Sequence, residues 1–186
     1  MEATPTPVPP QASREEKFVA SVIERCKKDK GLAARLRRAD NPATEYQSWE
    51  LLAGYGVDLE RDHERLPFAT VAAHIAKAKA EANGNVSLGR AIASAYDDGN
   101  QSDQAKARLR RVLACDELPE LCRILRPLLT LIDSRVTRPL DYVRLLKQLR
   151  RFGFATWKAD VHQVQRIKAQ WAQEFYGHKA EAGEAT

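Results

Sequence analysis

This 186-residue chain has few of the residues on which catalytic and metal sites are usually built. Its three cysteines, Cys26, Cys115 and Cys122, are odd in number and show no CxxC spacing, so we expect them to be reduced and buried. Its four histidines are scattered, and no two stand four residues apart on one helix as a zinc site prefers. The glycine-containing stretch 83–89 lacks the Lys-Ser/Thr pair and the preceding strand of a phosphate loop. We therefore predict no enzyme activity, no catalytic or metal residues, no cofactor and no small-molecule substrate.

Long apolar runs are also missing. The longest, Ile124 to Ile132, is interrupted by Arg126 and Pro127, and the first residues are rich in proline rather than apolar. A membrane-spanning helix needs about 20 apolar residues and a signal peptide needs an apolar segment of its own. We therefore expect a cytoplasmic protein with no membrane partner.

The sequence nowhere alternates apolar and polar residues for long enough to predict a strand. Apolar residues instead recur at helical spacing, and their 44% share is ample for a core. We predict an all-α fold of about eight to nine helices, with Trp49, Trp157 and Trp171 in apolar helix stripes that pack in the core. The expected helices cover residues 14–28, 32–39, 44–53, 66–82, 88–96, 104–115, 117–133, 139–151 and 156–176.

Composition also predicts how the chain is divided. The polar stretch 97–103 is the best boundary, which gives two small helical bundles, residues 14–97 and 102–177, joined by a short linker. The proline-rich leader 1–13 and the small polar tail 178–186 are expected to be disordered.

Positive charge is concentrated rather than spread evenly. The net charge is +5, with basic segments at 14–39 and 134–151 and an acidic segment at 40–70. Such clusters most often only solvate helix surfaces, but here arginine recurs in short runs at positions that can converge, and its planar fork suits phosphate oxygens. Contacts of this kind bind backbones and do not read sequence. The candidate nucleic-acid-binding residues are Arg37, Arg38, Arg90, Arg108, Arg110, Arg111, Arg126, Arg144, Lys147, Arg150 and Arg151.

Two other functions fit the composition. In the first, the helices are a protein–protein scaffold without direct nucleic-acid contact. The acidic stretch 57–64 then docks a basic neighbouring protein, and the arginines are only hydrated surface residues. The second is a helical transcription regulator, although no helix-turn-helix with a polar recognition helix is apparent.

Several motifs resemble a known family. They are Ser87–Ala93 (SLGRAIA), Ala107–Asp116 (ARLRRVLACD), Glu120–Leu129 (ELCRILRPLL), Pro139–Leu146 (PLDYVRLL) and Trp171–Tyr176 (WAQEFY). Together they resemble the CasB family, the small subunit of the type I-E CRISPR surveillance complex Cascade. The likeness extends from about residue 18 to 177 and is strongest from Ser87 onward.

The resemblance implies a non-catalytic, all-helical protein that pairs head to tail with a second copy of itself. It implies contacts with the crRNA-coating backbone subunit and the large subunit, and with the target and displaced DNA strands of the R-loop. Residues carried over by position as nucleic-acid contacts are Arg90, Arg108, Arg111, Arg126, Arg150 and Arg151. Pro127 departs from the second arginine often found there, and Arg90 is equally compatible with a structural role between the bundles.

Overall fold

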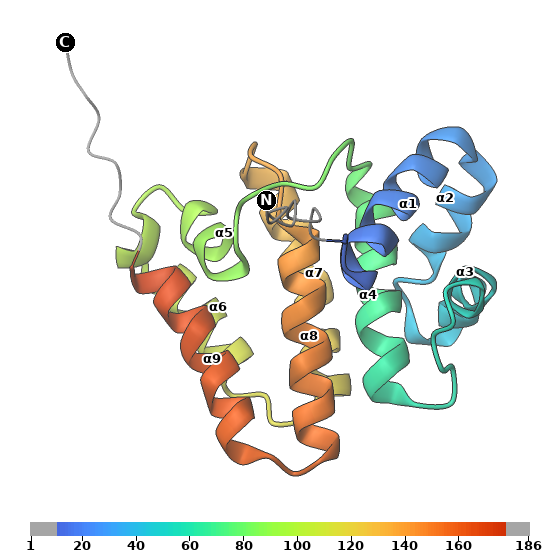
Figure 1. The fold of residues 1–186 in the computed structure, drawn as a ribbon. Coiled ribbons are helices and arrows are strands. Elements are labelled where there is room, and N and C mark those ends of the chain that lie inside the picture. The colour runs from blue at the N-terminus through green and yellow to red at the C-terminus, as the bar shows by residue number, and fades with distance from the viewer. Residues whose placement is uncertain (1–10, 178–186) are drawn as a thin grey trace, which may run out of the picture.

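The structure, a computed structural model, describes residues 11–177, so the predicted tail and all but the last three residues of the predicted leader lie outside the described residues. The described part folds into nine α-helices and two short 3-10 helices without a strand, which confirms the all-α prediction (Figure 1). The 3-10 helices span Pro42–Ser48 and Gly99–Gln101. The α-helices are α1 (Arg14–Lys28), α2 (Lys30–Arg38), α3 (Trp49–Gly54), α4 (Asp62–Ala78), α5 (Leu88–Ser94), α6 (Asp103–Leu113), α7 (Leu118–Arg135), α8 (Tyr142–Trp157) and α9 (Val161–Tyr176).

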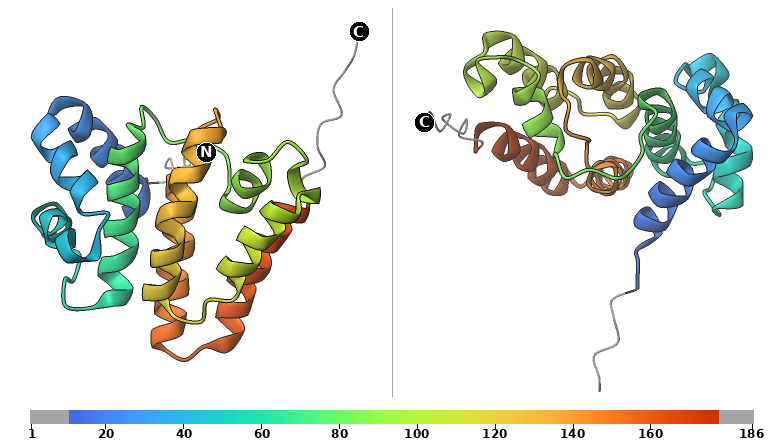
Figure 2. Two further views of the ribbon diagram at one scale, coloured as in Figure 1. Left: turned by 180° about the vertical axis from the view of Figure 1, so that it is seen from behind. Right: turned by 90° about the horizontal axis from the view of Figure 1, so that it is seen from above.

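Helix α4 lies at the centre of the molecule. Its residues 66–76 are all buried, because small alanines alternate with Phe68, Val71 and Ile75 around its whole circumference. Helices α1, α2 and α3 pack on one side of α4, and α7 and α8 pack on the other (Figures 1 and 2). A helix that is apolar all round is stable only when other helices cover it, and this arrangement supplies them.

The packing of helix α5 is relevant to the predicted division into two bundles, and that division stays a prediction. The sequence places α5 in the first bundle, but its main packing partner is α9, followed by α6. Gly89 allows this approach, since a Cβ atom added there would lie 2.3 Å from the carbonyl oxygen of Trp171. The buried apolar side chains of the described residues form one continuous cluster across both predicted bundles.

The start of α8 is held by the segment that follows α4. Gly84 N donates to Leu140 O at 2.9 Å, and a Cβ atom at Gly84 would lie 1.9 Å from Pro139 O, so a side chain there would clash. Asn83 then donates to Asp141 (3.0 Å) and accepts from Val143 N (3.1 Å), while Asp141 caps the helix by accepting from Arg144 N (2.9 Å). Residues 83–86 therefore fix where α8 begins.

The observed ends of α8 and α9 correct the prediction. Helix α8 begins at Tyr142 rather than 139 and continues past 151 to Trp157, and α9 begins at Val161 rather than 156. Trp171 is fully buried as predicted, but Trp49 and Trp157 are 41% and 53% exposed, so their assignment to the core was wrong.

Two smaller expectations also need correction. All three cysteines are free, and Cys115 and Cys122 are buried, but Cys26 is only half-buried. The stretch 57–64 is not all loop, since α4 begins at Asp62, and Val57 is buried.

Candidate nucleic-acid interface along helix α8

One face of α8 carries basic and aromatic side chains at helical spacing. Arg144, Lys147, Arg151, Phe154 and Lys158, just past the last turn, alternate at intervals of three and four residues, which places them along one stripe. The remaining side of the helix is buried through its leucines and Phe152. The apolar side therefore anchors α8 and presents the basic stripe outward.

Two depressions run along this stripe and share Lys147 and Arg151. The first, of about 520 Å³, extends from Asp141 and Arg144 at the start of α8 to Gln170 of α9. The second, of about 540 Å³, continues past Arg150 to Phe154 and is bordered by Gln163 of α9. We call the two together the α8 groove. It is the place where several of the predicted basic residues converge.

The groove already contains carboxylates from other helices. Lys147 Nζ lies 2.9 Å from Glu16 Oε1, and Arg150 forms a short ion pair with Glu15 and lies 3.6 Å from Glu64. Glu15 and Glu16 belong to the first turn of α1, where Ser13 caps the helix and Glu16 completes the capping box. The same turn thus caps α1 and pairs with α8.

These contacts alter the acidity of both carboxyl groups. The hydrogen bond from Lys147 and the one from the backbone of Ser13 hold the pKa of Glu16 below its usual value. Burial raises the pKa of Glu15, but its backbone hydrogen bond and the charge of Arg150 outweigh burial and leave that pKa lowered. Both groups are therefore ionised at neutral pH and partly neutralise the groove.

Arg144 belongs to a polar network that continues into the core. Its guanidinium lies 2.7 Å from Oε1 of Glu174, a carboxylate whose side chain is only 7% exposed. Glu174 also accepts from Gln148 (2.8 Å) and from Gly89 N (3.1 Å), and Gln148 in turn accepts from the indole N–H of the buried Trp171 (2.9 Å). The network ties α5, α8 and α9 together, so Arg144 has a structural partner.

Arg151 differs from its neighbours in the groove. It is exposed, and it forms no salt bridge with any residue between 11 and 177. Arg151 lines both depressions, so it is available to an external anion.

The other predicted basic residues lie elsewhere. Arg108, Arg110 and Arg111 are exposed on α6, which packs behind α9 and next to α7, whereas α8 and α9 form the opposite side (Figures 1 and 2). Arg37 and Arg38 are exposed at the end of α2, on the far side of α4. The predicted set therefore does not form one continuous surface.

Arg126 and Arg90 are less accessible than the arginines of α6. The side chain of Arg126 is 11% exposed and lies between Asp40 (3.8 Å) and Glu45 (3.7 Å), so it links α7 to the segment after α2. Arg90 is half-buried on α5 and forms no salt bridge within the described chain.

A second basic depression, at the ends of α1, α2 and α4, was not predicted. Lys27, Lys30, Arg37 and Lys79 line a hollow of about 540 Å³ at the ends of α1, α2 and α4, and only Arg37 of these was predicted. Lys27 and Lys30 belong to the basic segment 14–39, but they were not singled out, and Lys79 is 49 residues beyond Lys30 along the chain. Only the packing of α1 and α2 on α4 brings Lys79 to them.

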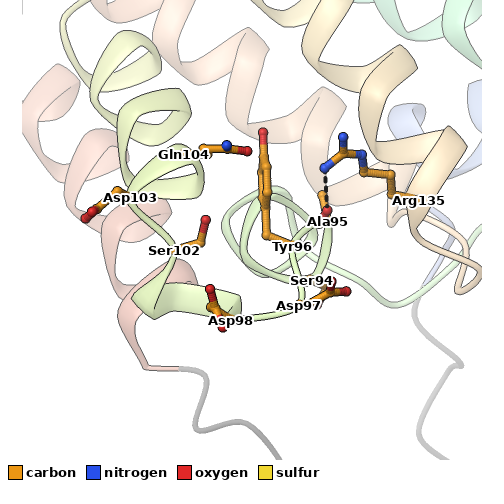
Figure 3. A pocket seen from close by; sticks show the side chains of 9 residues that line it. All are labelled: Ser94, Ala95, Tyr96, Asp97, Asp98, Ser102, Asp103, Gln104 and Arg135. Carbon is orange, nitrogen blue, oxygen red and sulfur yellow. Dashed lines mark hydrogen bonds between the residues drawn. The ribbon is translucent and has the colours of Figure 1, made fainter.

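Negative charge gathers around a third hollow, between α5 and α6. This open depression of about 770 Å³ is bordered by Asp97, Asp98 and Asp103, and Figure 3 shows the ring of Tyr96 standing in it. The guanidinium of Arg135 lies 5.0 Å from the centre of that ring and donates to Ala95 O at 3.3 Å. The predicted linker 97–103 is therefore an acidic surface rather than part of the basic one.

Metal-ligand clusters and membrane-spanning helices are not found in the described part of the chain. Residues 11–177 contain no group of three or more His, Cys, Asp or Glu side chains placed to hold a metal ion. Their helices also include none that is both long and apolar enough to cross a membrane.

Comparison with known proteins agrees with this geometry. A profile of the family described as CRISPR-associated protein Cse2 matches residues 32–176, well over half of the chain. The chain belongs to the Cse2 family. The resemblance to CasB predicted from the motifs is thereby confirmed, since CasB of M. ruber also shares the fold of this Cse2-family chain.

Two solved structures resemble the chain over nearly its whole length. M. ruber CasB is 24% identical with a TM-score of 0.68, and the match covers 90% of this chain and 94% of that one. A chain of a CRISPR RNA-guided surveillance complex is also 24% identical with a TM-score of 0.64, and the match covers 88% and 91%. No curated protein matches. Every predicted basic residue lies within the Cse2 match, whereas Glu15 and Glu16 precede it.

Proposed function

We propose that this Cse2-family chain is a non-catalytic subunit of the type I-E CRISPR surveillance complex Cascade, and that its α8 groove binds the sugar-phosphate backbone of opened DNA. Binding of the target or displaced strand in the R-loop does not depend on base sequence. The α8 groove is the observation that carries the proposal, since two joined depressions place Lys147, Arg150 and Arg151 along one path.

The physical chemistry of the groove supports a backbone ligand. Guanidinium groups form paired hydrogen bonds with phosphate oxygens, and each neutralised phosphate releases counterions. Opening a DNA duplex and forming the RNA–DNA hybrid nearly balance in free energy, so a few backbone contacts are enough to favour the open form. No bond needs to be made or broken, which agrees with the family and with the predicted absence of catalytic residues.

Partners follow from the same proposal. The solved relative described as a CRISPR RNA-guided surveillance complex supports assembly with other subunits of such a complex. We propose that these are the crRNA-coating backbone subunit, the large subunit and a second copy of this chain, in the bacterial cytoplasm. The exposed arginines of α6 are then available to a different strand or subunit than the α8 groove.

A salt titration tests the binding site directly. Affinity for a random-sequence single-stranded 20-mer is measured by fluorescence anisotropy over a series of salt concentrations, for the unmodified protein and for Lys147→Ala/Arg151→Ala. The slope of log K against log salt is negative, and loss of two phosphate contacts should reduce its magnitude by about 1.4. Arg123→Ala is the matched control, since this arginine is exposed on α7 and pairs only at 3.8 Å with Glu120. A slope that both variants leave unchanged contradicts the assignment of the groove.

A scaffold without nucleic-acid contact is the second candidate, and one observation favours it. Three basic side chains of α8, those of Arg144, Lys147 and Arg150, already have carboxylate partners within the chain, as a purely structural ion-pair network would. Under the scaffold hypothesis, reversing the charges of Asp58 and Glu60 in the predicted docking stretch disrupts assembly, while α8 substitutions have no effect on target binding. Under the nucleic-acid hypothesis the α8 substitutions weaken target binding.

A further inference from the structure

Two neighbouring aromatic rings are exposed at the C-terminal end of α8, and one of them, Phe154, lines the α8 groove. Phe154 and Trp157 are each 53% exposed, and Val161, the first residue of α9, is 65% exposed. Large aromatic side chains contribute most to stability and binding when they are buried. Neighbouring exposed rings therefore usually mark a surface that another molecule covers. Phe154 lines the same depression as Lys147 and Arg151.

The rings are held in place rather than loose. The centres of the Phe154 and Trp157 rings are 5.6 Å apart, and the imidazole of His63 stacks on the Trp157 indole at 4.5 Å with an angle of 18° between the planes. His63 is in the first turn of α4, and Gly153 allows α8 to approach it, since a Cβ atom there would lie 3.2 Å from His63 O. A ring ordered in this way loses little conformational freedom on binding.

Cations flank the rings on the same helix face. Arg151 is three residues before Phe154, and Lys158 follows it by four, so the two cations are separated by about 11 Å along the axis. The Lys158 ammonium lies 4.4 Å from the centre of the Trp157 ring and 5.9 Å from that of Phe154. A lysine on a flexible four-carbon stem can move from the ring to a phosphate, which frees the ring for another partner.

The carboxylates beside Phe154 are already engaged, whereas Trp157 lines a neighbouring depression with Glu60, Asp62 and Glu117, of which Asp62 pairs with Arg65 at 2.6 Å. Glu64 pairs with Arg14 (3.4 Å) and Arg150 (3.6 Å), and Asp160 caps α9 by accepting from Gln163 N (3.0 Å). Along the end of α8 the order is thus Arg151, the aromatic pair and then Lys158.

We infer that Phe154 and Trp157 form a stacking site for an unpaired nucleobase, which makes the α8 groove selective for single-stranded over duplex nucleic acid. The inference rests on the proposed function, because the groove must first bind the phosphates. Every base has a π-face, so stacking tolerates any sequence. In a duplex these faces are covered by neighbouring base pairs, and only the backbone remains available. The alternation of cation and ring matches the alternation of phosphate and base along one strand.

Comparison of two DNA forms tests the inference. Affinities of the full chain for a single-stranded 20-mer and for a 20-base-pair duplex are measured with Phe154→Ala and Trp157→Ala. Stacking contributes about 1–3 kcal/mol per base, so single-strand affinity should fall between about fivefold and about 160-fold, and duplex affinity should stay unchanged. Tyr46→Ala is the control, since this exposed tyrosine lies in the 3-10 helix on the other side of α4. Equal losses on both DNA forms, or none on either, overturn the inference.

Fluorescence supplies a second readout. Trp49→Phe leaves only Trp157 and the fully buried Trp171, so oligothymidine binding should quench the remaining emission, and adding Trp157→Phe should abolish that quenching. If Arg151→Ala weakens binding while Phe154→Ala and Trp157→Ala do not, the stacking site is wrong and the proposed function stands. If the unmodified protein binds neither DNA form, both are wrong. If the aromatic substitutions disrupt complex assembly and leave single-strand affinity intact, the rings are a protein contact and the inference is overturned.

Discussion

Lys147 Nζ lies 2.9 Å from Glu16 Oε1, so the basic α8 groove contains an internal anion supplied by the first turn of α1. Glu15 reinforces the arrangement by pairing with Arg150. An incoming phosphate must share Lys147 and Arg150 with these carboxylates or displace the carboxylates from them. Arg151, in contrast, has no carboxylate that competes with the phosphate. The affinity of the groove is therefore set by the difference between internal and external ion pairs.

Glu16→Gln should strengthen nucleic-acid binding. Exposed ion pairs have modest strength, so an increase of about two- to fivefold in single-strand affinity at moderate salt is expected. The measurement is a double-mutant cycle with Lys147→Ala, since competition predicts that Glu16→Gln has no effect once Lys147 is absent. Equal effects with and without Lys147 would show that Glu16 acts only by general electrostatic repulsion of the nucleic acid, and would contradict competition for Lys147.

Stability should depend on pH through the link between α1 and α8. The pKa values of Glu15 and Glu16 both lie below the ordinary 4.5. A lowered pKa in the folded state means that the stabilisation is complete above the unfolded value and is lost as pH falls through the folded one. Urea midpoints of the unmodified protein and of Glu15→Gln/Glu16→Gln should therefore differ most at about pH 7, and the difference should shrink as pH falls below 4.5. A constant difference over this range would contradict the assignment.

Arg144 and Arg151 should have opposite importance for stability and binding. Arg144→Ala removes the cationic partner of the buried Glu174 and should lower the free energy of unfolding by about 1–3 kcal/mol. Arg151→Ala, the matched control on the same face, should change it by less than about 0.5 kcal/mol while weakening nucleic-acid binding. Chemical denaturation and anisotropy on the same samples separate the two effects. Equal destabilisation by both substitutions would mean that the network through Glu174 is unimportant.

Gly89→Ala should destabilise the packing of α5 on α9. The added Cβ atom would lie 2.3 Å from Trp171 O and 2.7 Å from Phe175 N, and backbone atoms cannot move aside cheaply. We expect a loss of about 1–3 kcal/mol, measured as a lower thermal midpoint. Gly54→Ala is the control, because nothing lies within 4 Å of its Cβ position and the residue is helical. Similar midpoints for the two variants would refute the close approach.

The sequence predicted the all-α fold and most helix positions because periodic apolar residues are a local signal. The predicted end of α8, at 151, was too early and stands two residues before Gly153. In the structure Gly153 lies within α8, and its missing Cβ makes room for Leu118 Cδ2 at 2.7 Å and for the start of α4. The same early end placed Trp157 in the wrong helix and in the core. Glycine at a close approach and glycine at a turn look alike in a sequence.

The candidate site was predictable only in part, for a related reason. The basic residues Arg144, Lys147, Arg150 and Arg151 of α8 follow from helical spacing within one segment and were predicted, whereas Phe154 and Lys158 lie beyond the predicted end of the helix and were not. Which of the basic residues are neutralised depends on Glu15 and Glu16, which are more than 130 residues away along the chain. The sequence of its own helix likewise gives no sign that Arg126 is paired, and only tertiary packing brings Asp40 and Glu45 to it.

The most direct test measures target-DNA binding by the reconstituted surveillance complex that contains Lys147→Ala/Arg151→Ala in place of the unmodified chain. Complexes with Arg123→Ala and with Asp58→Lys/Glu60→Lys serve as controls, and assembly is checked by size-exclusion chromatography. The account predicts full assembly, weaker target binding and a shorter-lived R-loop for the α8 variant alone. Normal target binding by a fully assembled complex with the α8 variant would contradict it.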